Sequence, residues 1–103
     1  MNKAQVVWSA ESLADLEIIY DFLAEKSKTV AQQVVSDLLN RTEQLETFPE
    51  SGAIQQSLIS STKVYRYLVE GNYKILYSYN PQNNLVYIEI IFDARNDPEK
   101  LKI

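Results

Sequence analysis

The stretch from residue 64 to residue 95 constrains the fold of this chain most strongly, because it holds three β-prone runs separated by turn sequences. Gly71-Asn72, between the first two runs, is a dipeptide that readily takes the positive φ of a tight hairpin. Pro81, in the loop before the third run, fits position i+1 of a type I turn. We therefore predict an antiparallel meander with strands at residues 64–69, 73–80 and 85–92.

The side-chain alternation of these runs predicts which way each strand faces. In the second run the tyrosine-rich side should meet the rest of the core, which leaves Lys74 on the open side of the sheet. The third run is apolar on both sides, which favours a central strand. Unbroken alternation would place Val86, Ile88, Ile90 and Phe92 on one face of it, and Leu85, Tyr87, Glu89 and Ile91 on the other.

Two amphipathic segments come before the meander, after a short strand at residues 5–8 that ends in Trp8, a predicted core-edge anchor. Ser9 resembles an N-cap for a helix over residues 10–26, and Ser27-Lys28-Thr29 separates that helix from a second one over residues 30–47. Phe48-Pro49 should stop the second helix. The apolar stripes predicted to face the core are Leu13, Leu16, Ile19, Tyr20, Phe22 and Leu23 in the first helix, and Ala31, Val34, Val35, Leu38, Leu39, Thr42 and Leu45 in the second.

The resulting order is β-α-α-β-β-β, which predicts an α+β fold with a helical hairpin on one face of a mostly antiparallel sheet. With 103 residues, we expect a single domain, residues 1–103. The polar connection over residues 50–62 should be a loop, pinned to the core by Ile54, Leu58 and Ile59. Asp97-Pro98 predicts the start of a terminal helical turn.

Composition limits the chemistry that the chain can perform. It has no cysteine and no histidine, so thiolate metal sites, disulfides and histidine catalysis are excluded, and we expect no metal and no cofactor. The net charge is −4, with −5 in residues 1–50 and +1 in the remainder, so tight non-specific binding of nucleic acid is disfavoured. No apolar run is long enough to span a membrane, and we expect a cytoplasmic protein.

Several sequence motifs, taken in order, are similar to those of the ParE/RelE superfamily of small bacterial toxins, also called plasmid stabilisation proteins. They cover nearly the whole chain, from Trp8-Ser9, Ala14-Asp15-Leu16 and residues 18–22, through residues 45–49 and Gly52, to residues 65–69, 71–77 and 92–98. The resemblance implies a β-α-α-β-β-β fold, the order already reached from periodicity. It also implies a cognate antitoxin, whose C-terminal segment lies in the groove of the sheet.

The RelE branch of this superfamily implies ribosome-dependent cleavage of mRNA. On that alternative, the catalytic residues would be Lys63, Arg66, Lys74 and Arg95. The branch keeps a C-terminal tyrosine or a histidine as an acid or base, whereas this chain has Leu101 near that place and no histidine. We therefore assign no catalytic residue in the main hypothesis.

The ParE branch resembles the chain better and implies inhibition of DNA gyrase by protein–protein contact. Aromatic and arginine side chains are the usual anchors of such interfaces. The predicted partner-binding residues are Tyr65, Arg66, Tyr67, Lys74 and Arg95, on a sheet surface that we expect to be open and cationic. A third hypothesis is an inactive toxin homologue that retains antitoxin binding, and a homodimer is a further possibility.

Each predicted cation also has a purely structural interpretation. Arg66 could hold the meander to a strand neighbour or a helix carboxylate, and Lys74 could be a solvated sheet lysine. Arg95 lies between Asp93 and Asp97 in the sequence, so a local ion pair is the structural alternative there.

Overall fold

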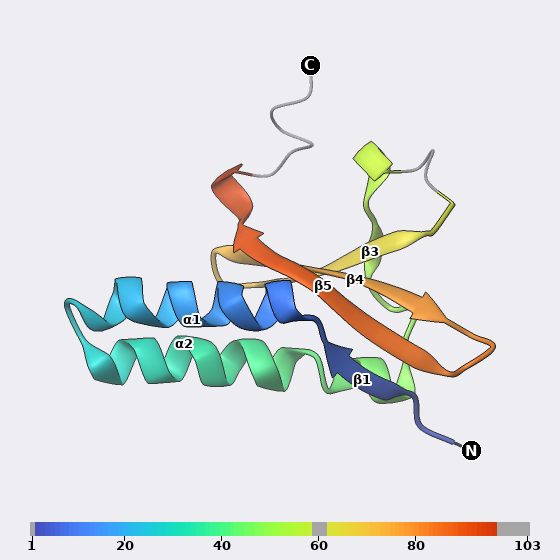
Figure 1. Ribbon diagram of the computed structural model, residues 1–103, viewed down its shortest axis with the longest axis horizontal. Coiled ribbons are helices and arrows are strands. Elements are labelled where there is room, and N and C mark those ends of the chain that lie inside the picture. Colours follow the sequence, from blue (N-terminus) through green and yellow to red (C-terminus); the bar gives the residue numbers. More distant parts are fainter. Residues whose placement is uncertain (1, 59–61, 97–103) are drawn as a thin grey trace.

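The computed structural model describes residues 2–58 and 62–96, which form a helical hairpin packed against a twisted sheet (Figure 1). The described elements are, in order, β1 (Gln5–Trp8), α1 (Ala10–Ala24), α2 (Lys28–Arg41), α3 (Gln44–Thr47), β2 (Ala53–Ile54), the 3₁₀ turn η1 (Gln56–Leu58), β3 (Tyr65–Glu70), β4 (Tyr73–Asn80), β5 (Leu85–Asp93) and the 3₁₀ turn η2 (Ala94–Asn96). The predicted α+β class is confirmed. The helical start expected at Asp97-Pro98 lies outside the described residues.

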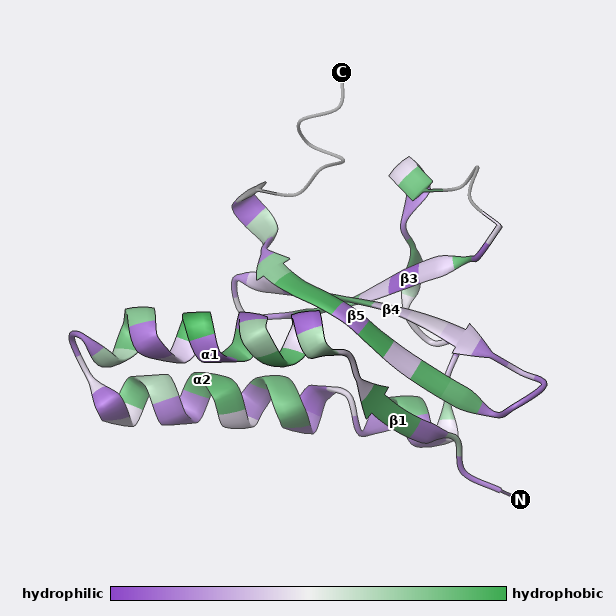
Figure 2. Cartoon of the chain, in the orientation of Figure 1, coloured by the Kyte–Doolittle hydropathy of each residue, from purple (hydrophilic) through white to green (hydrophobic). Residues whose placement is uncertain are grey.

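The sheet has five strands in the order β1-β5-β4-β3-β2. β1 pairs with β5 in parallel, and the other neighbouring strands pair antiparallel, which confirms a mostly antiparallel sheet. β4 occupies the middle, and β5 is an interior strand between β1 and β4. Figure 2 shows apolar residues along much of β5, as suits a strand with neighbours on both sides.

Serine caps begin both long helices. The Ser9 hydroxyl accepts a hydrogen bond from the Ser12 backbone N–H at 2.9 Å, and the Ser27 hydroxyl accepts one from Val30 N–H at 3.2 Å. The predicted cap at Ser9 is therefore present. The predicted three-residue break has the right length but lies two residues too late, because α1 ends at Ala24 and Lys28 is already the first residue of α2.

The buried side of α1 differs from the predicted stripe. Leu16 is buried and Ile19 packs against the core, whereas Leu13 is 53% exposed and Phe22 is 70% exposed. Ser12, which is fully buried, takes the place that the prediction gave to Leu13. The reason is that the Ser12 hydroxyl donates to the Ser9 carbonyl at 2.9 Å, so burial next to the sheet leaves it satisfied.

The predicted second helix divides into α2 and α3. Thr42 N–H bonds to the Leu39 carbonyl three residues earlier, and the Thr42 hydroxyl donates to the same carbonyl at 2.8 Å. This local competition for a backbone acceptor tightens the last turn and ends α2. Leu38 and Leu45 are fully buried, whereas Leu39 is 42% exposed, so the predicted stripe is wrong at Leu39.

The helix-facing side of the sheet supplies most of the core. Ile75 and Tyr77 of β4 are fully buried, and Tyr73 and Tyr79 pack against the core cluster. The prediction that the tyrosine-rich side of β4 is structural is confirmed. Trp8 also packs against this cluster from the edge.

A β-bulge in β5 overturns the predicted alternation. Leu76 pairs with Ile90, but the next residue of β4, Tyr77, pairs with Ile88, so Glu89 is an extra residue without a partner in β4. Val86 and Ile88 face the core before the bulge, and Ile91 faces it after the bulge. Ile90 and Phe92 therefore lie on the open face, opposite to the prediction.

The connection after α3 contains a strand that the sequence did not reveal. Ala53 and Ile54 form β2 at the sheet edge, opposite Tyr67 and Arg66. Ile54 is 37% exposed, so the predicted pinning of this segment through Ile54 is wrong. Gln55 is buried instead, and Ile59 lies outside the described residues. None of the described helices has the length and apolar character that a membrane span needs.

Candidate functional site

The face of the sheet opposite the helices is the candidate site. Strand register places its side chains in rows across β3, β4 and β5. The rows are Tyr65, Ser78 and Tyr87; Tyr67, Leu76 and Ile90; and Val69, Lys74 and Phe92. Lys74 is the one charged side chain in these rows. The expectation of a cationic surface is therefore wrong, because aromatic and aliphatic side chains dominate this face.

Lys74 lies on the predicted face but is buried, with 8% of its surface exposed. Its ammonium is 3.7 Å from the centre of the Tyr67 ring, a cation–π contact. The interpretation of Lys74 as a solvated lysine is wrong, and two of the predicted partner-binding residues form one contact with each other. Tyr67 and Lys74 thus stabilise the sheet face, and Tyr65, which is half-buried, lies in the neighbouring row beside Ser78.

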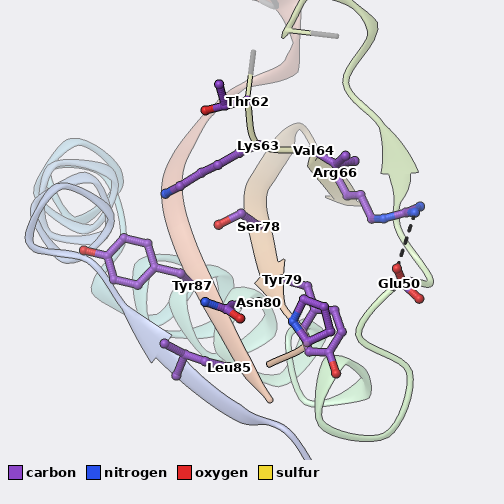
Figure 3. A pocket seen from close by; sticks show the side chains of 11 residues that line it. Glu50, Thr62, Lys63, Val64, Arg66, Ser78, Tyr79, Asn80, Leu85 and Tyr87 are labelled. Atoms are coloured by element: carbon purple, nitrogen blue, oxygen red, sulfur yellow. Dashed lines mark ion pairs between the residues drawn. The ribbon is translucent and has the colours of Figure 1, made fainter. Parts of the chain in front are cut away.

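A pocket of about 770 Å³ opens where β3, β4 and β5 meet the loops that follow and precede them. Of the predicted site residues, Lys63 and Arg66 line it, and Tyr65, Tyr67, Lys74 and Arg95 do not. Lys63 and Arg66 also point in different directions (Figure 3). The pocket is lined by Glu50, Thr62, Lys63, Val64, Arg66, Ser78, Tyr79, Asn80, Pro81, Leu85 and Tyr87.

Arg66 is directed toward the edge of the sheet. Its guanidinium donates to the Gly52 carbonyl at 3.0 Å and lies 4.0 Å from the Glu50 carboxylate. The Gly52 N–H in turn donates to the Tyr77 hydroxyl at 2.9 Å. Burial raises the pKa of Tyr77, so this hydroxyl stays protonated as part of the core. Arg66 therefore ties β3 to the segment before β2, which agrees with its structural interpretation.

Arg95 forms the local ion pair anticipated as its structural alternative. Its guanidinium is 2.5 Å from the Asp93 carboxylate, at the end of β5, and the Arg95 side chain is 76% exposed. Hydrogen bonds from Arg95 hold the pKa of Asp93 down at about 2. The pair stays charged at neutral pH, with Arg95 outside the pocket.

Glu89 is the residue at this site that the sequence reasoning missed. The Ser78 hydroxyl donates to its Oε2 at 2.8 Å, and the Lys63 ammonium lies 3.8 Å from the same oxygen. On the helix side, the Glu89 carbonyl accepts a hydrogen bond from the Ser9 hydroxyl at 2.8 Å. The backbone of the bulge is therefore fixed by Ser9 on the helix side of the sheet, and the Glu89 carboxylate lies on the opposite face. No sequence signal marked the bulge, because apolar residues stand on both sides of it.

Asp15 of α1 supports the same bulge, since its Oδ2 accepts the Ile91 N–H at 2.9 Å. We expect Asp15→Ala to lower the free energy of unfolding by about 1–2 kcal/mol, because a partly buried N–H loses its acceptor. Urea unfolding followed by the fluorescence of Trp8 measures the change. Asp15→Asn, which keeps an acceptor oxygen, should recover most of the loss, and Glu17→Ala on the exposed side should stay within about 0.5 kcal/mol of wild type. Equal losses for Asp15→Ala and Glu17→Ala would contradict the role of this bond.

Within residues 2–58 and 62–96, no three acidic side chains gather as a metal site would require. The pocket's charged groups are two cations and the exposed Glu50, with Glu89 bonded to two of the lining residues. Its walls include the rings of Tyr79 and Tyr87 and the side chains of Leu85 and Pro81. Such a mixture suits recognition of a partner with both apolar and polar groups.

Comparison with known proteins relates this chain to one family. The family described as the ParE toxin of the type II toxin–antitoxin system parDE matches residues 6–98. Toxin RelE2 of Caulobacter vibrioides is 32% identical over 71 residues, which are 64% of this chain and 81% of that protein. The solved structure titled "Chromosomal ParDE TA system from P. aeruginosa" shares the fold with a TM-score of 0.70 at 19% identity, over 88% of this chain and 96% of that one.

Proposed function

Because the chain belongs to the family of ParE toxins of type II toxin–antitoxin systems, we propose that it acts by binding DNA gyrase and inhibiting it, and not by cutting RNA. The family implies a cognate antitoxin as a partner. Gyrase as the target places the proposed action in the cytoplasm. The observation that carries the proposal is the character of the open sheet face, which is aromatic and aliphatic with few charges.

The positions of the cations support binding over catalysis. Phosphoryl transfer needs several positive groups aimed at one phosphate, together with an acid and a base. Here Lys63 lies by Glu89, and Arg66 is bonded to the Gly52 carbonyl. Lys74 lies against the Tyr67 ring, and Arg95 is paired with Asp93. Each of these four side chains therefore contacts a different group, which supports binding over a shared phosphate site.

The row of Tyr65, Ser78 and Tyr87 favours a protein partner. Tyrosine supplies a large contact area at low entropic cost and is enriched at the centres of protein interfaces. Tyr87 is 36% exposed, and Val64 and Val69 near the two ends of β3 are 59% and 47% exposed. We propose that the target contacts this face, with Tyr65 and Tyr87 among the anchors, and that the antitoxin segment blocks it by lying in the same groove.

A supercoiling assay with purified gyrase and relaxed plasmid tests the proposal. We expect the purified toxin to inhibit at micromolar concentration, and Tyr65→Ala to raise the half-inhibitory concentration at least about tenfold, as loss of an interface anchor does. Phe22→Ala, at a residue of α1 that is 70% exposed and belongs to the helical layer on the other side of the sheet, is the matched control and should inhibit like wild type. Full supercoiling activity at micromolar toxin would count against gyrase as the target.

Primer extension on translated mRNA distinguishes the RelE-type alternative. A ribosome-dependent nuclease leaves cuts within codons, and a gyrase inhibitor leaves none. Growth arrest on induction, relieved by co-expression of the neighbouring antitoxin gene, would establish the toxin–antitoxin pair itself. Harmless induction would favour the inactive homologue instead.

A further inference from the structure

The carboxylate of Glu89 is a built feature of the open face. The bulge that carries it is fixed by two hydrogen bonds from the helix side, one from the Ser9 hydroxyl to the Glu89 carbonyl and one from Ile91 N–H to Asp15. Its side chain is 20% exposed, and the Ser78 hydroxyl orients it. A carboxylate held this rigidly, with most of its surface out of water, is prepared to receive a positive group.

The contacts of the Glu89 carboxylate leave part of its hydrogen-bond accepting capacity unused. Both the Ser78 hydroxyl and the Lys63 ammonium approach Oε2. Among residues 2–58 and 62–96, no donor reaches Oε1. The Lys63 ammonium is 3.8 Å away and its side chain is 58% exposed, so this ion pair is loose and open to exchange. A planar cation with two parallel N–H donors would use both oxygens at once.

The surroundings of Glu89 favour a guanidinium over an ammonium. Ser78, which is bonded to Glu89, lies between Tyr65 and Tyr87 across the strands. Aromatic rings beside a carboxylate provide stacking surfaces for a guanidinium plane. A phosphate, by contrast, would be repelled by Glu89, and the net charge of −4 adds to that repulsion.

We propose that Glu89 is the acceptor for an arginine side chain of the target protein, and that Lys63 occupies this position in the free toxin. This inference rests on the proposed function for the identity of the target. Binding replaces the loose ion pair between Lys63 and Glu89 with a bidentate pair between Glu89 and the arginine of the target, beside the Tyr87 ring. Glu89 is then a specificity-determining residue of the target-binding face.

Glu89→Gln keeps the size of the side chain and an acceptor for Ser78 but removes the charge. We expect it to raise the half-inhibitory concentration in the gyrase assay at least about tenfold. Lys63→Ala removes the intramolecular competitor, so we expect inhibition to be unchanged or several-fold stronger. If the face instead binds phosphate, Lys63→Ala weakens inhibition and Glu89→Gln strengthens it, which would overturn the proposal.

A small-molecule titration tests the site without gyrase. N-acetyl-arginine amide is the probe, and the uncharged N-acetyl-citrulline amide is the matched ligand control. We expect the arginine probe to shift the backbone NMR signals of Glu89, Ser78 and Tyr87 at millimolar concentration, and the citrulline probe to shift them far less. The shifts should be lost in Glu89→Gln and kept in Glu43→Gln, at an exposed residue before α3.

The two experiments separate the two proposals. If wild type does not inhibit gyrase but binds the arginine probe through Glu89, the choice of gyrase is wrong and the cation site stands. If wild type inhibits gyrase and Glu89→Gln inhibits equally well, the role of Glu89 is wrong and the target stands. Retained two-dimensional NMR dispersion of Glu89→Gln confirms that its fold is intact, so loss of binding reports on the site.

Discussion

Replacing Gly52 with alanine is expected to lower the free energy of unfolding by about 3 kcal/mol, which is the cost of overpacking a rigid site. An added Cβ would lie 2.7 Å from the Tyr67 carbonyl oxygen and 2.7 Å from the Tyr77 hydroxyl. Neither neighbour can move cheaply, because one belongs to the backbone of β3 and the other to a fully buried ring. The shift would also strain the bond from Arg66 to the Gly52 carbonyl.

The second glycine of the chain provides the control. Gly71 has φ +58° in the β3–β4 turn, and nothing lies within 4 Å of its added Cβ. Gly71→Ala should therefore cost about 1 kcal/mol, from backbone strain alone. Urea unfolding followed by Trp8 fluorescence measures both variants. A smaller loss for Gly52→Ala than for Gly71→Ala would show that the surroundings of Gly52 relax to accept a Cβ, contrary to the prediction.

Leu38→Ala is expected to cause a loss of similar size, about 3 kcal/mol, because it removes a fully buried side chain and leaves a cavity. Leu38 belongs to the core cluster, together with Leu16 of α1 and Leu45 of α3. The matched change at the next residue, Leu39→Ala, should alter stability by less than about 1 kcal/mol, since Leu39 is 42% exposed.

Thermal unfolding by circular dichroism compares the two leucine variants with wild type. A stability change of about 3 kcal/mol in a domain of this size lowers Tm by at least about 10 °C. Equal shifts in Tm for Leu38→Ala and Leu39→Ala would mean that Leu38 is not more buried than Leu39, so that α2 presents a different side to the core.

The fold was largely predictable from the sequence because its signals are local. Gly71 marks the first hairpin of the meander with the positive φ expected of it. Ser9 marks the start of α1 through its own capping bond. The alternation of β4 correctly placed Tyr77 in the core. Each of these features depends on residues within a few positions of one another, where propensity and turn chemistry act directly.

The errors concern features that distant contacts decide. Ile88, Glu89 and Ile90 would fit an unbroken strand, whereas the structure has a bulge that is held by hydrogen bonds with Ser9, the N-cap of α1, and Asp15 of α1. The exposed positions of Leu13 and Phe22 follow from the way α1 is docked, which periodicity alone does not reveal.

The sheet face opposite the helices was predictable from the sequence, but the environments of its charged residues were not. The open face of β3 and β4 was the predicted surface, and Tyr65 and Tyr67 lie on it. The partners of the cations could not be read from the sequence. Arg66 bonds to a backbone carbonyl fourteen residues away, and Glu89 reaches Lys63 across the sheet. Whether the predicted residues contact a partner stays a prediction that the variants above test.

The parallel pairing of β1 with β5 has a consequence for the timing of folding. Ser9 and Glu89, joined by a hydrogen bond, are 80 residues apart in the sequence. Contacts of such long range slow folding, and during synthesis they form only after the late strand has left the ribosome. The tyrosine-lined surface of the nascent chain is therefore incomplete until β5 has been synthesised, and an antitoxin made earlier has that interval in which to meet the toxin.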